Sequence, residues 1–152
     1  MATLATQDID ILKEAKRSLD TDYVPGDDEE YMSEQQKEYF RKLLTEWKRS
    51  IHASADTTLQ SLKDGPIREP DLNDRASSET DWSIELRTRD RQRKLISKID
   101  SALRRLDADE YGYCEVSGEP IGIKRLIARP VATMTVEAQE AHERREKISR
   151  DD

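Results

Sequence analysis

The sequence predicts a mainly α-helical protein, in which a long antiparallel coiled-coil hairpin carries a small turn-rich module and a C-terminal helix. Apolar residues make up 34% of the chain and charged residues 39%, too few apolar residues to enclose a large core. Two helices that each bury one stripe need far fewer apolar residues. Two apolar stripes are present, the first with steps of three and four residues, and the composition changes after Asp109.

The first expected unit is an N-terminal segment, residues 1–32, with one helix that packs on the base of the hairpin. A weak helical pattern occupies the first twenty residues. Its members are Ile9, Leu12, Ala15, Lys16 and Leu19. The acidic stretch DTDYVPGDDEE follows, and its Pro25-Gly26 pair predicts a loop.

The second unit is the hairpin, residues 33–108, with its tip at about 65–80. Ser33 followed by Gln36 forms a capping-box pattern, so the first arm should begin there. Its stripe contains Phe40, Leu43, Leu44, Trp47, Ile51, Ala55, Leu59 and Leu62. The Gly65-Pro66 pair should end this arm.

The second arm follows the polar stretch DGPIREPDLNDRASSET, which we expect to form the turn. Its stripe contains Leu86, Leu95, Ile96, Ile99, Leu103 and Leu106. Opposite charges one turn apart, Asp90 with Lys94 and Asp100 with Arg104, are typical of a solvent-exposed helix. By pattern alone, the favoured interpretation of both arms is a structural coiled coil with no function at its tip.

Residues 109–134 form the third unit, a compact module of turns and short strands, and residues 135–152 form a closing helix and tail. Small modules of this kind often depend on a metal. Cys114 is the only cysteine, so no intramolecular disulfide is possible. A formal charge of −7 argues against general binding to nucleic acid. The chain also lacks a long apolar run and an apolar N-terminal signal core, so we expect a cytoplasmic protein without membrane contact.

The run YGYCEVSGEPIGIKRLIARP resembles the zinc-finger signature of the DksA/TraR family, which pairs two C-x2-C motifs. On that frame Cys114 keeps the first ligand position, and Ser117, Thr135 and Ala138 replace the other three. None of these three is a useful zinc ligand. The resemblance therefore implies a degenerate finger without zinc, stabilised by packing. The candidates for this packing are Tyr111, Tyr113, Val116, Ile121, Ile123, Leu126, Ile127, Val131 and Met134. Cys114 itself would be a packed remnant of the site or a redox sensor.

At the expected hairpin tip, DLNDRA is similar to the family's D-x-x-D-x-A motif, with Asp71, Asp74 and Ala76 at the fixed positions. The resemblance spans residues 31–147 and implies a transcription factor that is not an enzyme. Its hairpin would enter the secondary channel of RNA polymerase and alter open-complex stability at ribosomal RNA and biosynthetic promoters. It would act with guanosine tetraphosphate (ppGpp) in the stringent response.

Paired aspartates can serve acid–base chemistry or bind a metal, but the turn offers no histidine, nucleophile or phosphate loop. We therefore favour an electrostatic role for Asp71 and Asp74 beside the catalytic magnesium of the polymerase. The alternative is that either aspartate caps the second arm. Ala76 would permit close approach to the polymerase.

The resemblance also implies a contact for the polymerase rim and ppGpp, formed by Arg91, Leu95, Lys98 and Arg129. Lys and Arg side chains form charge-assisted hydrogen bonds to phosphate. The position after the fourth ligand is usually basic in the family, whereas this chain has Gln139. Without the resemblance, the basic residues would be read as a solvated face.

Two other functions remain open: a transcript-cleavage helper of the Gre type, which also has an acidic hairpin tip, and a helical adaptor that does not bind polymerase. A DNA-binding finger repressor is disfavoured by the missing ligands and the negative charge. We expect a monomer that does not recognise DNA sequence directly.

Overall fold

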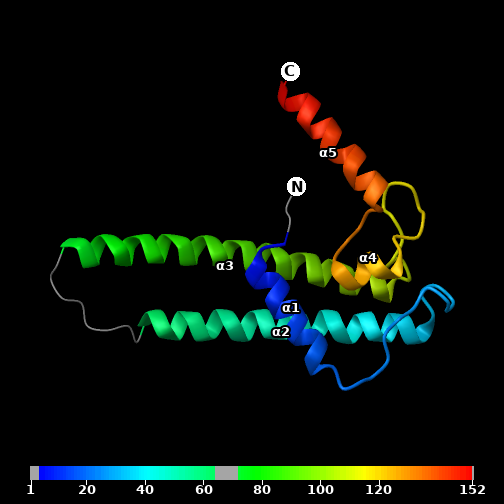
Figure 1. Cartoon of the computed structure of the whole chain (residues 1–152), viewed down its shortest axis with the longest axis horizontal. Coiled ribbons are helices and arrows are strands. Elements are labelled where there is room, and N and C mark those ends of the chain that lie inside the picture. The colour runs from blue at the N-terminus through cyan, green and yellow to red at the C-terminus, as the bar shows by residue number, and fades with distance from the viewer. Residues whose placement is uncertain (1–3, 64–71, 152) are drawn as a thin grey trace.

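The computed structural model describes residues 4–63 and 72–151, and this part of the chain contains five helices. They are α1 (Thr6–Ser18), α2 (Glu34–Lys63), α3 (Leu72–Asp107), α4 (Ile123–Ala128) and α5 (Val136–Asp151). In Figure 1, α2 and α3 run antiparallel as the arms of a long hairpin, and α1 lies across them. α4 sits at the base of the hairpin, and α5 projects away from it (Figure 1). The predicted mainly helical fold class is confirmed.

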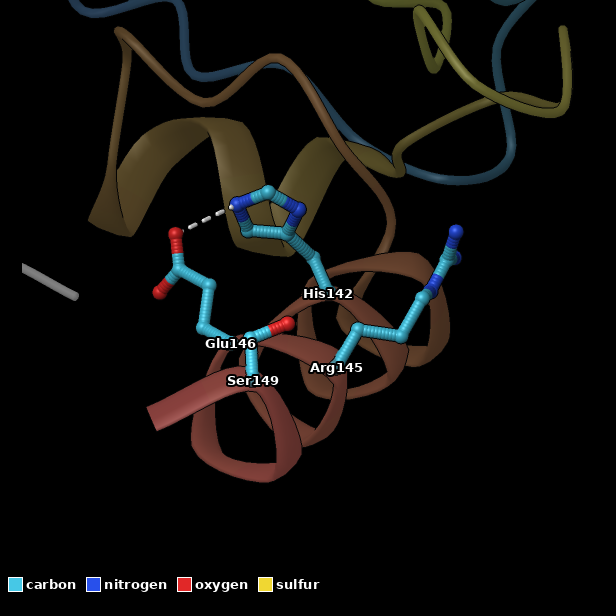
Figure 2. A pocket seen from close by; sticks show the side chains of 4 residues that line it. All are labelled: His142, Arg145, Glu146 and Ser149. Carbon is cyan, nitrogen blue, oxygen red and sulfur yellow. Dashed lines mark ion pairs between the residues drawn. The ribbon is translucent and has the colours of Figure 1, made fainter. Parts of the chain in front are cut away.

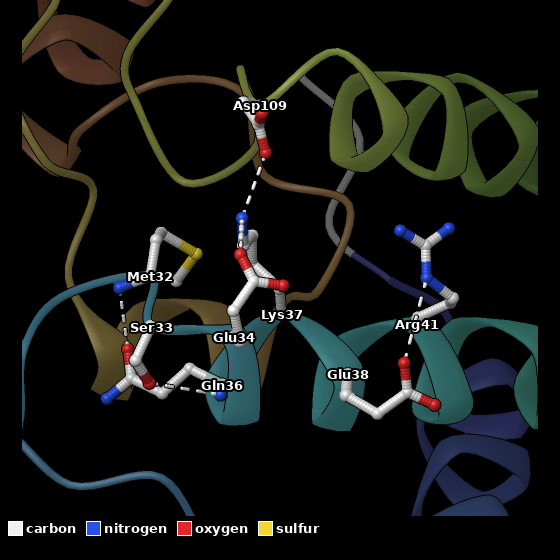
Figure 3. A network of polar contacts seen from close by, with 8 residues as sticks. All are labelled: Met32, Ser33, Glu34, Gln36, Lys37, Glu38, Arg41 and Asp109. Carbon is white, nitrogen blue, oxygen red and sulfur yellow. Dashed lines mark hydrogen bonds and ion pairs between the residues drawn. The ribbon is translucent and has the colours of Figure 1, made fainter.

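The start of α2 is fixed by a variant of the predicted capping box. The Oγ of Ser33 accepts a hydrogen bond from the backbone N–H of Gln36 at 3.3 Å. The side-chain Oε1 of Gln36 accepts one from the N–H of Met32 at 2.7 Å, one residue earlier than in the standard box (Figure 3). Gln36 is fully buried, and its Nε2 also donates to the carbonyl of Gly26. The cap thus ties the loop before α2 to the helix.

The core lies in the base half of the hairpin, where α1 covers the seam between α2 and α3. α2 contributes Tyr39, Phe40, Leu43, Leu44, Trp47 and Ile51; α3 contributes Leu95, Ile99, Ala102 and Leu106; α1 contributes Leu12 and Ala15. Each large apolar side chain buried in this way contributes about 1.5–3 kcal/mol relative to exposure. The two predicted stripes therefore form the core where α1, the loop before α2 and the module after α3 cover them.

Ion pairs across the seam set the antiparallel register. Lys48 pairs with Asp100 at 2.7 Å, and Arg41 pairs with Asp107 at 2.6 Å. Lys37 reaches Asp109, just beyond α3, at 2.9 Å (Figure 3). The prediction that Asp100 pairs within its own helix is wrong, because Lys48 reaches it from the opposite arm. Such solvent-exposed pairs contribute at most about 1 kcal/mol each and mainly favour one alignment.

Two predicted core residues are exposed instead. Leu86 is 52% exposed, because it lies further towards the tip than the part of α3 that α1 covers. Val116 is 63% exposed, because it lies in the turn between Cys114 and Ser117. In the distal part of α2, Ala55 is half-buried, and the side chains of Leu59 and Leu62 lie outside the described set.

The module after α3 contains turns, one isolated antiparallel bridge between Tyr113 and Pro120, and the six-residue helix α4. We expected short strands here, and none is present in the described residues. α4 was not expected; it buries Ile123 and Leu126, which lie three residues apart on one face. Among the described helices, none combines the length and apolar composition that a membrane span requires.

Candidate functional site

In the sequence, the predicted tip falls around the segment that joins the end of α2 at Lys63 to the start of α3 at Leu72, and both of these helix ends lie far from the base of the hairpin (Figure 1). Asp71 lies outside the described residues. Asp74 and Ala76 lie in the first turns of α3, and their side chains are also outside the described set. α3 has 36 residues, so it extends about 50 Å from the base. The roles of these three residues stay predictions.

A groove of about 260 Å³ brings part of the predicted ligand contact together. α3 supplies Lys98, α4 and the residue after it supply Arg125 and Arg129, and α5 supplies Gln139. Arg125 donates from Nε to the carbonyl of Met134 at 3.0 Å, which holds the segment before α5 against α4. Burial and the neighbouring charge of Arg125 lower the pKa of Arg129, and Glu143 opposes that shift. The groove is therefore a concave, positively charged surface.

The other two predicted contact residues do not line this groove. Leu95 is 4% exposed and packs in the core. Arg91 donates from Nε to Oδ2 of Asp8 on α1 at 3.1 Å, and Asp8 is 1% exposed. A signal for this pair was present in the sequence: Asp8, Leu12 and Ala15 are spaced by four and three residues, as on one face of a helix, and all three are buried on α1. The roles of Leu95 and Arg91 in a polymerase contact stay predictions.

The four positions of the finger frame are held by hydrogen bonds and packing. Burial opposes ionisation of the Cys114 thiol, yet hydrogen bonds from the side chain and backbone of Ser117 and from the backbone of Thr135 and Val116 lower its pKa to about 6. Thr135 precedes α5, and its Oγ1 accepts from the N–H of Ala138 at 3.2 Å, as an N-cap does. Ala138 packs against the core.

This donor set does not fit zinc, which needs about four thiolate or imidazole ligands. One thiolate is present, and the hydroxyls of Ser117 and Thr135 already bond within the protein. Among the described residues, no group of three or more His, Cys, Asp or Glu side chains could hold a metal ion.

Tyrosine hydroxyls make hydrogen bonds that cross-link the module. The Tyr111 hydroxyl donates to the carbonyl of Pro130 at 2.7 Å, and burial raises the pKa of Tyr111 well above its usual value. The Tyr31 hydroxyl donates to the carbonyl of Gly112 at 2.6 Å and accepts from the N–H of Gly122 at 3.1 Å. Gly112 has φ +92°, and a Cβ there would lie 2.9 Å from the sulfur of Met32. The N-terminal loop thus contacts the module directly.

Several groove residues were not predicted, and His142 is the one that can take up a proton to become a cation. His142 on α5 lines the groove together with Gln139, and also borders a more open hollow of about 460 Å³ with Arg145 and Ser149. Figure 2 shows the imidazole beside the Glu146 carboxylate, and the Nε2–Oε1 distance is 3.0 Å. The sequence contains only two histidines, and this scarcity was the available signal.

Comparisons with known proteins agree with this architecture. The family model described as the DnaK suppressor protein DksA, N-terminal domain, matches residues 36–106. The prokaryotic dksA/traR C4-type zinc finger matches residues 109–144, although three of its four cysteine positions hold other residues here.

Curated relatives and a solved structure share most of the chain. The RNA polymerase-binding transcription factor DksA of Caulobacter vibrioides is 58% identical over 132 residues, covering 87% of this chain and 93% of that protein. The protein of the same name from Escherichia coli K12 is 43% identical, covering 81% and 80%. The structure of transcription factor DksA2 from Pseudomonas aeruginosa aligns with a TM-score of 0.69 and 42% identity, covering 77% and 90%. These relatives are named as transcription factors and not as enzymes, and the chain belongs to the DksA family of transcription factors.

Proposed function

We propose that the protein binds RNA polymerase directly and regulates transcription initiation by inserting its hairpin tip into the secondary channel. The observation that carries this proposal is the long hairpin, in which Asp74 and Ala76 of the D-x-x-D-x-A motif lie in the first turns of α3, at the helix end remote from the core (Figure 1). The relatives at 58% and 43% identity are named as RNA polymerase-binding factors. The protein would act in the cytoplasm, as a monomer that does not recognise DNA sequence itself.

The tip would act electrostatically. A carboxylate brought beside a catalytic magnesium ion changes the local charge without taking part in bond formation. Inside a protein channel, where the effective dielectric constant is lower than in bulk water, this interaction is stronger than at an exposed surface. The consequence would be a shift in the stability of promoter open complexes, with lower initiation at ribosomal RNA promoters and changed initiation at biosynthetic ones.

The groove between α3, α4 and α5 would hold ppGpp against the polymerase rim. Lys98 and Arg129 lie in it, and their cationic side chains suit the phosphates of this nucleotide. Arg91 would join this contact only if its bond to Asp8 were exchanged for one to the ligand or the polymerase. The nucleotide would link the groove to the stringent response.

The test is multi-round transcription in vitro from a ribosomal RNA promoter, with and without ppGpp. We expect the native protein to repress and Asp74→Asn to lose most of that repression while keeping its affinity for polymerase. Asp81→Asn is the matched control, because Asp81 is an exposed aspartate two turns further along α3. Equal activity of native protein and Asp74→Asn would contradict the proposed tip. Cleavage of backtracked transcripts would favour the Gre-type function, and failure to bind core polymerase would favour the adaptor.

We further propose that the finger module works without zinc. We expect the thermal unfolding midpoint and the repression to be unchanged after prolonged incubation with a strong chelator. Metal analysis of the purified protein should find much less than one zinc per chain. A structural zinc contributes about 10–16 kcal/mol in finger peptides, so a chelator that lowered the midpoint by many degrees would overturn this proposal.

A further inference from the structure

The α5 wall of the groove contains one side chain that can gain a positive charge. Gln139 and His142 both line the groove and lie three residues apart, so they share one face of α5. Gln139 is a neutral amide at every pH. His142 is an imidazole, which becomes a cation when it binds a proton. Lys98 lies opposite on α3, and Arg125 and Arg129 lie on the side of α4.

The imidazole of His142 is accessible to a ligand. The side chains of His142 and Glu146 are 49% and 44% exposed, and their Nε2–Oε1 contact is 3.0 Å (Figure 2). An exposed pair of this kind contributes at most about 1 kcal/mol, so it can rearrange readily when an anion arrives. Arg145, on the same helix, borders the outer hollow and not the groove. His142 therefore contacts the carboxylate of Glu146 and lines the same groove as three cationic side chains.

We propose that the protonated imidazole of His142 is a direct contact for the phosphate groups of the ligand in this groove. It provides from α5 the positive charge that Gln139 cannot provide. The inference rests on the proposed function for the identity of the ligand, ppGpp. Imidazolium N–H groups donate charge-assisted hydrogen bonds to phosphate oxygens, as the guanidinium and ammonium groups across the groove do.

Proton binding and ligand binding are then coupled. The ring of His142 contacts Glu146, and Lys98, Arg125 and Arg129 also line the groove. A bound phosphate adds negative charge beside the ring, so the ligand promotes protonation of His142 and a proton promotes ligand binding. The affinity should therefore rise as the pH falls. One charge-assisted hydrogen bond corresponds to about a tenfold change in affinity.

The first experiment measures the ppGpp concentration that gives half of its effect on transcription by the polymerase complex, at about pH 6.3 and about pH 7.8. The native protein should need about tenfold less ppGpp at the lower pH, and His142→Gln should lose that difference. The matched control is His52→Gln, which removes the second histidine, an exposed residue of α2 outside the groove. It should behave as the native protein does. A pH difference that survives in His142→Gln, or that disappears in His52→Gln, would overturn the inference.

A rescue variant separates contact from structure. Gln139→Lys combined with His142→Gln places a permanent cation on the same face one turn earlier. It should bind ppGpp equally well at both pH values, with an affinity near that of the native protein at the lower pH. If the double variant binds as weakly as His142→Gln alone, a positive charge on this face of α5 is not what the ligand requires.

A second readout does not need polymerase. In the isolated protein, the imidazole proton resonances of His142 are followed against pH by NMR, with and without inorganic pyrophosphate as the probe. The midpoint should move to higher pH with pyrophosphate, while that of His52 stays in place. No movement would overturn the inference. If the movement occurs but ppGpp has no effect on transcription at either pH, the proposed function has failed and the groove contact stands.

Discussion

Thr135, which the finger frame places at a ligand position, caps a helix in this chain. Its hydroxyl caps α5 by accepting the N–H of Ala138. Thr135→Val keeps the size and removes the acceptor, so we expect the free energy of unfolding to fall by about 1 kcal/mol. Thr135→Ser keeps the acceptor and should remain near the native value. Urea denaturation measures both, and equal stability of the two variants would show that the cap does not contribute.

The second prediction at the residue scale concerns how ionisation of the Cys114 thiol makes stability depend on pH. Hydrogen bonds from Ser117, Thr135 and Val116 outweigh burial and lower the pKa of its thiol to about 6, whereas an unfolded thiol has a pKa of about 8.5. A depressed pKa in the folded state stabilises the fold. That stabilisation is fully present above about pH 8.5, and it is lost as the pH falls towards 6.

The stability difference between the native protein and Cys114→Ala should therefore widen as the pH rises from about 6 to about 8.5. Absorbance of the thiolate near 240 nm gives the ionisation midpoint directly. Ser117→Ala removes the side-chain hydrogen bond, so it should move that midpoint upwards. A midpoint near 8.5 in the folded native protein would contradict the hydrogen-bonded thiolate.

At the scale of elements, α1 is held to the hairpin by a buried charge. Asp8 is 1% exposed and bonds to Arg91 on α3, whose side chain is 42% exposed. Asp8→Ala leaves Arg91 free to hydrate, so we expect a loss of about 2 kcal/mol, below the range for a fully buried pair. Asp10→Ala removes an exposed carboxylate from the same helix and should change stability by less than about 0.5 kcal/mol.

Urea denaturation and amide hydrogen exchange across residues 6–18 measure the effect on α1. In Asp8→Ala, exchange in α1 should accelerate more than exchange in α2. If the two variants exchange alike, the Asp8–Arg91 pair does not hold α1. Asp8→Ala also tests the predicted role of Arg91. If this variant binds polymerase more tightly than the native protein does, the Asp8–Arg91 bond competes with the predicted contact between Arg91 and polymerase.

The sequence predicts an element well where its own apolar stripe is enough to show which residues are buried. The stripe of α2 is buried from Phe40 to Ile51, as its spacing predicted. Leu86 belongs to the predicted stripe of α3 and is exposed, because an apolar pattern does not tell which part of a stripe a third helix will cover. α4 escaped prediction because six residues are too few for a helical period to be counted.

At the scale of the whole molecule, the groove could be predicted only in part. Lys98, Arg129 and Gln139 were identified through the resemblance, and the fold places them together. His142 joins them only because α5 starts beside α4 and α3, which no local pattern encodes. The same reason explains why the partner of Arg91 was missed, since 83 residues separate it from Asp8.

The last prediction concerns insertion itself. Trp82, 42% exposed, lies on the distal half of α3, whereas Trp47 is fully buried at the base. Hydroxyl-radical footprinting should therefore oxidise Trp82 in the free protein and spare Trp47. If the hairpin enters the channel, oxidation of Trp82 should fall several-fold when core polymerase is added, while Val24, 64% exposed in the N-terminal loop, should change little. Asp74→Asn should show the same protection, because the carboxylate is expected to act after insertion and not to drive it. Binding without protection of Trp82 would mean that the protein contacts polymerase by another surface.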